Sequence, residues 1–165
     1  MRVLGVDTSL RSSGVAVVEE RGSALVAVDY GTIINPPRRS LSDCLKCLHE
    51  DLSTFIDRHK PEQAAVEGLF YCKNVKTATT LAHARGVAIA VCTLAGLPVF
   101  EYAPRSVKQA VVGYGAAEKE QVRRMVMAIL ALKEEPGEDA GDALAIAVCH
   151  LHSRIGHKAL APRPI

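Results

Sequence analysis

Long apolar runs and a regular cysteine framework are both missing from this sequence of 165 residues. No apolar run approaches the roughly 20 residues that a helix needs to cross a bilayer, which predicts no membrane span. The five cysteines are odd in number and irregularly spaced, which indicates reduced thiols rather than disulfides. The chain starts directly with Met1 and Arg2 and an apolar strand, so we expect no signal peptide and a cytoplasmic location.

Several familiar site motifs are incomplete. Residues 113–115 (Gly-Tyr-Gly) lack the third glycine of a dinucleotide-binding loop and are better explained as a turn after a helix. The serines of the loop 8–14 have no partner base in evidence, so a nucleophilic serine is a poor interpretation. Cys44 and Cys47, with His49 nearby, could suggest zinc, but a lone Cys-x-x-Cys in an amphipathic helix favours two packed thiols.

The remaining composition is typical of one packed domain. Apolar residues make up 48% of the chain and charged residues 23%, which indicates a folded protein. We see no repeat, linker or second domain, and expect a single domain over residues 1–155 with a frayed tail, 156–165.

The hydrophobic pattern alternates between short strands and longer helices. Three strands come first, then a helix, and strands and helices alternate until a helical end. This order predicts an α/β fold with a mixed five-stranded sheet, its first three strands antiparallel, flanked by helices. The predicted strands are 3–7, 14–18, 24–28 (with 32–34 as an extension), 64–67 and 98–102, and the predicted helices are 41–56, 74–95, 104–113, 118–133 and 138–153.

Four carboxylates stand at the ends of these elements. Asp7 and Glu67 each close a short apolar strand, and strands of one sheet can bring such ends side by side. Asp139 and Asp142 are three residues apart in the first turn of an apolar helix, so they share one face. The simpler explanations are that Asp7 caps a turn and that the helix acids complement the helix dipole. These explain each acid singly, but not why two strands also end in acids.

Four converging carboxylates would repel one another unless cations compensate them, and Mg²⁺ and Mn²⁺ prefer oxygen ligands. Two such ions about 3.5–4 Å apart can activate water and stabilise a leaving oxygen in phosphodiester hydrolysis. Between Gly68 and Arg124, basic residues outnumber acidic ones by eight to three, which suits a polyanion-binding face, although solvated helix surface is the alternative. Together the patterns indicate a metal-dependent nuclease.

The order of the four acids and several local motifs resemble the RuvC family of Holliday-junction resolvases. The resemblance covers nearly the whole chain. Its motifs are Val66-Glu67-Gly68-Leu69-Phe70, His83-Ala84-Arg85-Gly86-Val87-Ala88-Ile89, Val99-Phe100-Glu101-Tyr102, Val107-Lys108-Gln109-Ala110-Val111-Val112-Gly113, Ala117-Glu118-Lys119 and Asp139-Ala140-Gly141-Asp142-Ala143-Leu144-Ala145-Ile146-Ala147.

The resemblance implies a ribonuclease-H-like fold and a homodimer that nicks two symmetry-related strands of a four-way DNA junction in recombination and repair. It implies two Mg²⁺ ions per site, with Mn²⁺ as an alternative, and a branch-migration helicase complex as a partner. The implied catalytic residues are Asp7, Glu67, Asp139, Asp142, Lys108 and Lys119, the four acids being the metal ligands. The predicted DNA-binding residues are Phe70, Lys73, Lys76, Arg85, Arg105, Lys108, Lys119 and Arg123.

Two departures from the family pattern stand beside the acids. Thr8 and Ser9 replace the usual Pro-Gly after the first Asp, and Gly68 stands where Gln is common. Three rival functions remain open: a related nuclease acting on RNA, one acting on RNA–DNA hybrid, and a non-catalytic junction-binding module. The apolar helix 74–95 is the expected dimer interface.

Overall fold

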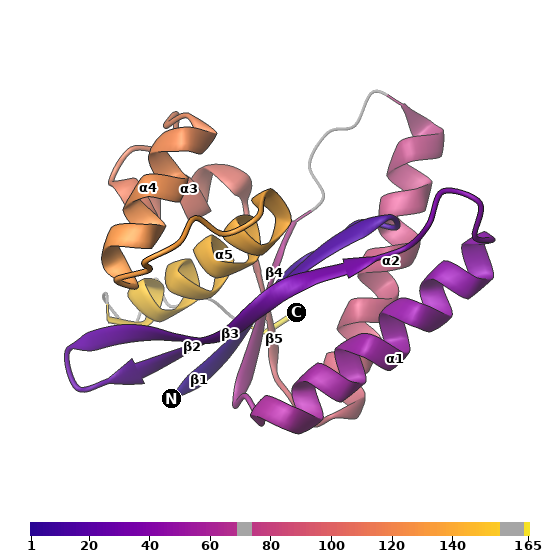
Figure 1. Ribbon diagram of the computed structural model, residues 1–165, viewed down its shortest axis with the longest axis horizontal. Helices are drawn as coiled ribbons and strands as arrows, with labels where there is room; N and C mark the ends of the chain where they lie inside the picture. Colours follow the sequence, from indigo (N-terminus) through magenta and orange to yellow (C-terminus); the bar gives the residue numbers. More distant parts are fainter. Residues whose placement is uncertain (69–73, 156–163) are drawn as a thin grey trace.

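The computed structural model describes residues 1–68, 74–155 and 164–165, and shows a twisted five-stranded sheet between two layers of helices (Figure 1). The strand order is β3-β2-β1-β4-β5. The elements are β1 (Arg2–Asp7), β2 (Ser12–Arg21), β3 (Ala24–Ile34), α1 (Leu41–His59), β4 (Gln63–Glu67), α2 (Val75–Leu94), β5 (Val99–Tyr102), α3 (Pro104–Val112), α4 (Lys119–Ile129) and α5 (Glu138–Ile155). The predicted mixed α/β architecture is confirmed.

The pairing of the strands is mixed, as predicted. β2 pairs antiparallel with both β1 and β3, whereas β4 is parallel to both β1 and β5. Parallel neighbours end at the same edge of a sheet. The carboxyl ends of β1 and β4 therefore lie together, at the edge where the candidate site lies.

Each face of the sheet has its own hydrophobic core, because side chains alternate along a strand. Leu4, Val6 and Val66 point to the face covered by α1 and α2. Val3 and Ala65 point to the opposite face, covered by α3, α4 and α5 (Figure 1). Residues 143–149 of α5 are buried on all sides, which confirms the prediction that this helix is enclosed against the sheet.

Three elements, β2, β3 and α4, differ most from the sequence prediction. β2 has 10 residues because it is longer at both ends, including the polar residues before the hairpin, and β3 has 11 because its pairing with β2 runs from Ala24 to Ile34. α4 ends at Ile129, not near Lys133, and Ala131 has the left-handed φ of 50°. A residue in that conformation ends a helix even where Leu130 and Leu132 continue its apolar pattern.

Within the part of the chain that the structure describes, no helix combines the length and hydrophobicity of a bilayer span. The last two residues lie beside β5. The backbone amide of Ile165 donates to the carbonyl of Val99 at 2.9 Å, and Pro164 forms a bridge with Phe100.

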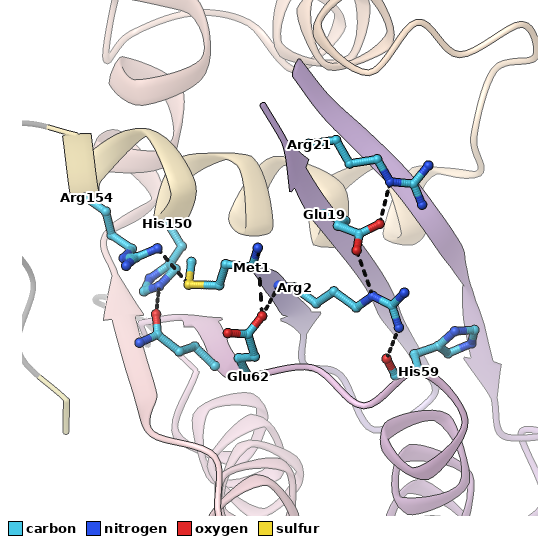
Figure 2. A network of polar contacts seen from close by, with 9 residues as sticks. Met1, Arg2, Glu19, Arg21, His59, Glu62, His150 and Arg154 are labelled. Atoms are coloured by element: carbon cyan, nitrogen blue, oxygen red, sulfur yellow. Dashed lines mark hydrogen bonds and ion pairs between the residues drawn. The ribbon is translucent and has the colours of Figure 1, made fainter. Parts of the chain in front are cut away.

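At the start of β1, opposite the strand ends that carry the acids, polar contacts tie several elements together (Figure 2). The Arg2 guanidinium donates to Glu19 of β2 at 3.2 Å and to the carbonyl of His59 at 2.9 Å. Its backbone amide donates to Glu62 at 2.8 Å, and Arg154 of α5 contacts the sulfur of Met1. These contacts fix the N-terminal end of β1 relative to α1, β2 and α5.

His150 of α5 joins two strands from inside the core. Its Nε2 lies 2.7 Å from Gln63 Oε1 and its Nδ1 lies 2.8 Å from the hydroxyl of Tyr102. An amide oxygen only accepts, so Nε2 carries the proton and Nδ1 accepts from Tyr102. Burial lowers the pKa of His150 to about 4, so the ring is neutral at pH 7.

Replacing Tyr102 with Phe is expected to lower the free energy of unfolding by about 1–3 kcal/mol, because Nδ1 of buried His150 loses its donor. Chemical denaturation at neutral pH measures the loss. Tyr114→Phe is the matched control: Tyr114 is 64% exposed, and its change should stay within about 0.5 kcal/mol. Equal losses in the two variants would contradict this role of Tyr102.

Candidate active site

Asp7 and Glu67 lie at the ends of adjacent parallel strands. Val6 pairs with Val66, so the next residue on each strand is one of the two acids. Val6 and Val66 face α1 and α2, and alternation therefore turns both acids to the α5 face. The strand-end acids predicted to come together from 60 residues apart are adjacent.

Two glycines allow α5 to approach the sheet backbone closely. A Cβ on Gly5 of β1 would lie 2.1 Å from the carbonyl oxygen of Ala143. A Cβ on Gly14 of β2 would lie 1.9 Å from the carbonyl oxygen of Asp139. Any larger residue would push the helix outward, so these positions bring the first turn of α5 within reach of Asp7.

A cavity of about 350 Å³ joins three of the predicted acids to both predicted catalytic lysines. Strands β1 and β4 supply two of the acids, and the three helices α3, α4 and α5 supply the other polar groups. The lining residues are Asp7, Glu67, Pro104, Val107, Lys108, Lys119, Val122, Asp142, Ala145 and Ile146. The cavity is thus lined by three acids, two lysines and several apolar residues.

Lys119 of α4 pairs with two of the α5 acids. Its Nζ lies 2.9 Å from Glu138 Oε1 and 3.4 Å from Asp142 Oδ2. The Glu138 contact and the nearby Asp142 charge raise the pKa of Lys119, so the ammonium form is favoured. One lysine therefore links α4 to the acidic start of α5.

Burial, together with the charges of neighbouring acids, raises the pKa values of Asp7, Glu67 and Asp142. Burial, followed by the charges of Asp142, Glu67 and Asp139, raises the pKa of Asp7 from 3.8 to about 7, and Lys119 partly offsets this. Burial is also the main cause of the raised pKa values of Glu67 and Asp142. A half-buried oxygen cluster with excess negative charge fits a hard divalent cation.

The acids do not form a closed cage as they lie. Within residues 1–68, 74–155 and 164–165, no three His, Cys, Asp or Glu side chains are close enough to hold a metal ion. Asp139 is absent from the cavity lining and its carboxylate accepts a hydrogen bond from Ser12, while Asp142 contacts Lys119. The donor set fits a metal in its chemistry, and two of its members already have partners in the protein, Asp139 in Ser12 and Asp142 in Lys119.

The turn after Asp7 is held by side chains where the family pattern has Pro-Gly. The hydroxyl of Ser13 accepts from the Ser9 amide at 3.0 Å and donates to the Ser9 carbonyl at 2.5 Å. Asn35 donates to the Leu10 carbonyl at 3.0 Å. The loop therefore has local and long-range anchors without proline.

Some of the predicted DNA-binding side chains already form ion pairs within the protein, and others are exposed to solvent. Exposed Lys76 lines a cavity of about 530 Å³ with the β1–β2 loop, and Arg105 is also exposed. Arg85 pairs with Glu101 and donates to the Glu67 carbonyl at 3.3 Å, so DNA would compete with these contacts. Arg123 pairs with acids at positions 120 and 135. Phe70 and Lys73 lie outside the described residues.

Four contributors to the site were not predicted from the sequence. Gly5 and Gly14 could have been suspected, since glycine inside a strand often marks a close backbone approach. Ser12 and Glu138 carried no signal, because their partners, Asp139 and Lys119, are distant in sequence.

Without metal, the stability gained by Asp7→Asn is expected to depend on pH. The folded-state pKa of about 7 exceeds the unfolded value near 3.8, so folded wild type loses stability as pH rises between them. The asparagine variant escapes this loss, and its advantage should grow from about pH 4 to about pH 7 and then level off. Thermal unfolding in chelator at about pH 5 and pH 8 tests this; an advantage that shrinks with pH would contradict it.

The fold is that of the ribonuclease-H-like class of α/β proteins. The yeast mitochondrial Holliday junction resolvase Ydc2, 11% identical, shares the fold with a TM-score of 0.64 over 91% of this chain and 78% of its own. Residues 3–150 match the family described as "Crossover junction endodeoxyribonuclease RuvC".

This chain belongs to the RuvC family of crossover junction endodeoxyribonucleases, which are metal-dependent nucleases. The RuvC of Syntrophomonas wolfei is 45% identical over 93% of this chain and 90% of its own length. The structure of Thermus thermophilus RuvC with a Holliday junction substrate is 31% identical, with a TM-score of 0.92 over 100% of this chain and 99% of that chain. The predicted family is confirmed.

Proposed function

We propose that this protein resolves four-way DNA junctions by paired symmetric nicks, through Mg²⁺-dependent phosphodiester hydrolysis, in recombination and repair. The observation that carries the proposal is the shared cavity, in which Asp7, Glu67 and Asp142 face Lys108 and Lys119. The similarity to a RuvC solved with a Holliday junction substrate supports the choice of DNA.

In this proposal Asp7, Glu67, Asp139 and Asp142 hold the metal ions. Bound metal would supply an activated water and stabilise the departing oxygen. Because the pKa of Asp7 lies near 7, part of the metal-free population is protonated at neutral pH, and a binding cation must displace that proton.

Lys108 and Lys119 would act on the phosphate. Both line the acidic cavity, and phosphate groups attract ammonium ions strongly. Lys119 is restrained by Glu138, so its charge stays at the cavity wall before DNA arrives. The apolar wall, with Val107 and Ile146, limits water around the reacting phosphate.

Assembly follows the family expectation. We propose a homodimer with α2 in the interface, which would place two sites on symmetry-related strands. Val75 and Leu94, at the two ends of α2, are 79% and 82% exposed, which suits a helix that can bury more surface. A branch-migration helicase complex as partner and a cytoplasmic location belong to the same proposal.

Substrate comparison tests the function directly. The protein is incubated with a mobile four-way DNA junction, linear duplex DNA and RNA–DNA hybrid, with Mg²⁺ titrated against chelator. Symmetric nicks in the junction that require Mg²⁺ are expected. Preferred cutting of the hybrid would favour the RNA-directed alternative, and tight junction binding without nicks would favour a binding module.

A further inference from the structure

Among the described residues, Ser12 is the one most distant in sequence whose side chain contacts a proposed catalytic acid: it lies 127 residues before Asp139. It is the first residue of β2, and its hydroxyl donates a hydrogen bond to Oδ2 of Asp139 in the first turn of α5. Both residues are partly buried at the sheet edge where β1 and β4 end.

Asp139 has neither of the restraints that the other acids have. Asp7 and Glu67 are fixed by strand pairing, and Asp142 contacts Lys119. Asp139 lies in the first turn of α5, and its carboxylate accepts the hydrogen bond from Ser12. Gly14, two residues along β2, lies against the backbone of Asp139, so β2 fixes both the main chain and the carboxylate.

We infer that Ser12 is a positioning residue for metal binding: its hydroxyl holds one oxygen of Asp139 and leaves the other oxygen to the cation. This inference rests on the proposed function. A hydrogen bond to a ligating carboxylate commonly controls metal affinity about 10- to 100-fold. The contact is a further link between β2 and the site, beyond the packing of Gly14.

The alternative is that the contact only ties β2 to α5. In that case Ser12→Ala would lower the melting temperature but would leave the affinity of the folded protein for Mn²⁺ unchanged. The two explanations therefore differ in a measurement made on the protein without DNA.

Ser12→Ala is compared with Ser12→Thr, which keeps the hydroxyl, and with Ser53→Ala, because the Ser53 hydroxyl donates within its own helix to the His49 carbonyl. Direct Mn²⁺ binding by electron paramagnetic resonance, the Mg²⁺ concentration for half-maximal nicking, and the melting temperature in chelator are measured. Ser12→Ala should weaken Mn²⁺ binding and raise the Mg²⁺ requirement about tenfold. Ser12→Thr and Ser53→Ala should stay within about threefold of wild type.

A second substitution connects the effect to Asp139. In an Asp139→Asn background, Ser12→Ala should weaken Mn²⁺ binding no further, because the carboxylate it orients is gone. Suppose that wild type nicks the junction. The role of Ser12 would then be overturned if Ser12→Ala kept the wild-type Mn²⁺ affinity, or if Ser12→Ala weakened Mn²⁺ binding further in the Asp139→Asn background. Wild type that fails to nick at any Mg²⁺ concentration would overturn the proposed function and this inference with it.

Discussion

Asp7→Asn is expected to reduce the nicking of a four-way DNA junction by at least about 10³-fold while leaving junction binding within about twofold. A thousandfold loss corresponds to about 4 kcal/mol of transition-state stabilisation, within the several kcal/mol that a metal ion supplies. Asp7 is the acid on which the charges of the other three converge, so its removal affects the centre of the cluster. Single-turnover nicking and a binding assay in chelator measure the two effects.

A matched control is available on the surface. Asp57 of α1 is 78% exposed and pairs only with Lys60, at 3.1 Å, among the ion pairs of the described residues. Asp57→Asn makes the same chemical change away from the cavity and should nick at the wild-type rate. If Asp7→Asn nicked as fast as Asp57→Asn, the assignment of Asp7 as a metal ligand would be wrong.

Gly14→Ala is the second large expected effect. The new Cβ would lie 1.9 Å from the carbonyl oxygen of Asp139 and 2.4 Å from its carbonyl carbon, and both atoms are backbone. Relief requires movement of the first turn of α5 away from β2. Overpacking of this kind costs about 1–3 kcal/mol, and a 1 Å displacement of catalytic groups can cost about 10²-fold in rate.

Denaturation and single-turnover nicking measure both losses. Gly31→Ala, on the neighbouring β3, is the control, because its added Cβ meets nothing within 4 Å and Gly31 has no positive φ. Its stability should stay the same or rise by up to about 1 kcal/mol. A Gly14→Ala variant with wild-type stability and rate would show that close approach of α5 is unnecessary.

The features predicted correctly from the sequence are those that depend on the local pattern of apolar and charged residues. Two apolar strands each closing in an acid placed Asp7 beside Glu67, and the apolar helix after Asp139 was correctly expected to be enclosed. The family, the α/β class and the antiparallel first three strands are confirmed. The roles of the acids and lysines remain proposals, although the cavity unites five of the six residues.

The unpredicted part of the site depends on tertiary contacts. Ser12 and Asp139 are 127 residues apart, and no local rule pairs a strand-start serine with a helix-start aspartate. Arg85 was predicted to bind DNA from its basic surroundings, but its pairing with Glu101 depends on how α2 lies against β5. The charge pattern of a sequence shows whether a region is basic or acidic. It does not show which of its charged side chains form ion pairs within the folded protein.

The contact of α5 with Gly5 and Gly14 is made through its backbone, so the height of the helix above β1 and β2 does not depend on side-chain volume there. The backbone contact with Gly5 lies between the acidic first turn and the second half of the helix. A change of side-chain size in the second half, at Val148 or Leu151 for example, should therefore leave the first turn in place. A designer could vary that half to alter thermostability while the spacing between Asp7 and the helix acids stays constant. Stability and catalytic geometry are thereby adjustable along one helix at different positions.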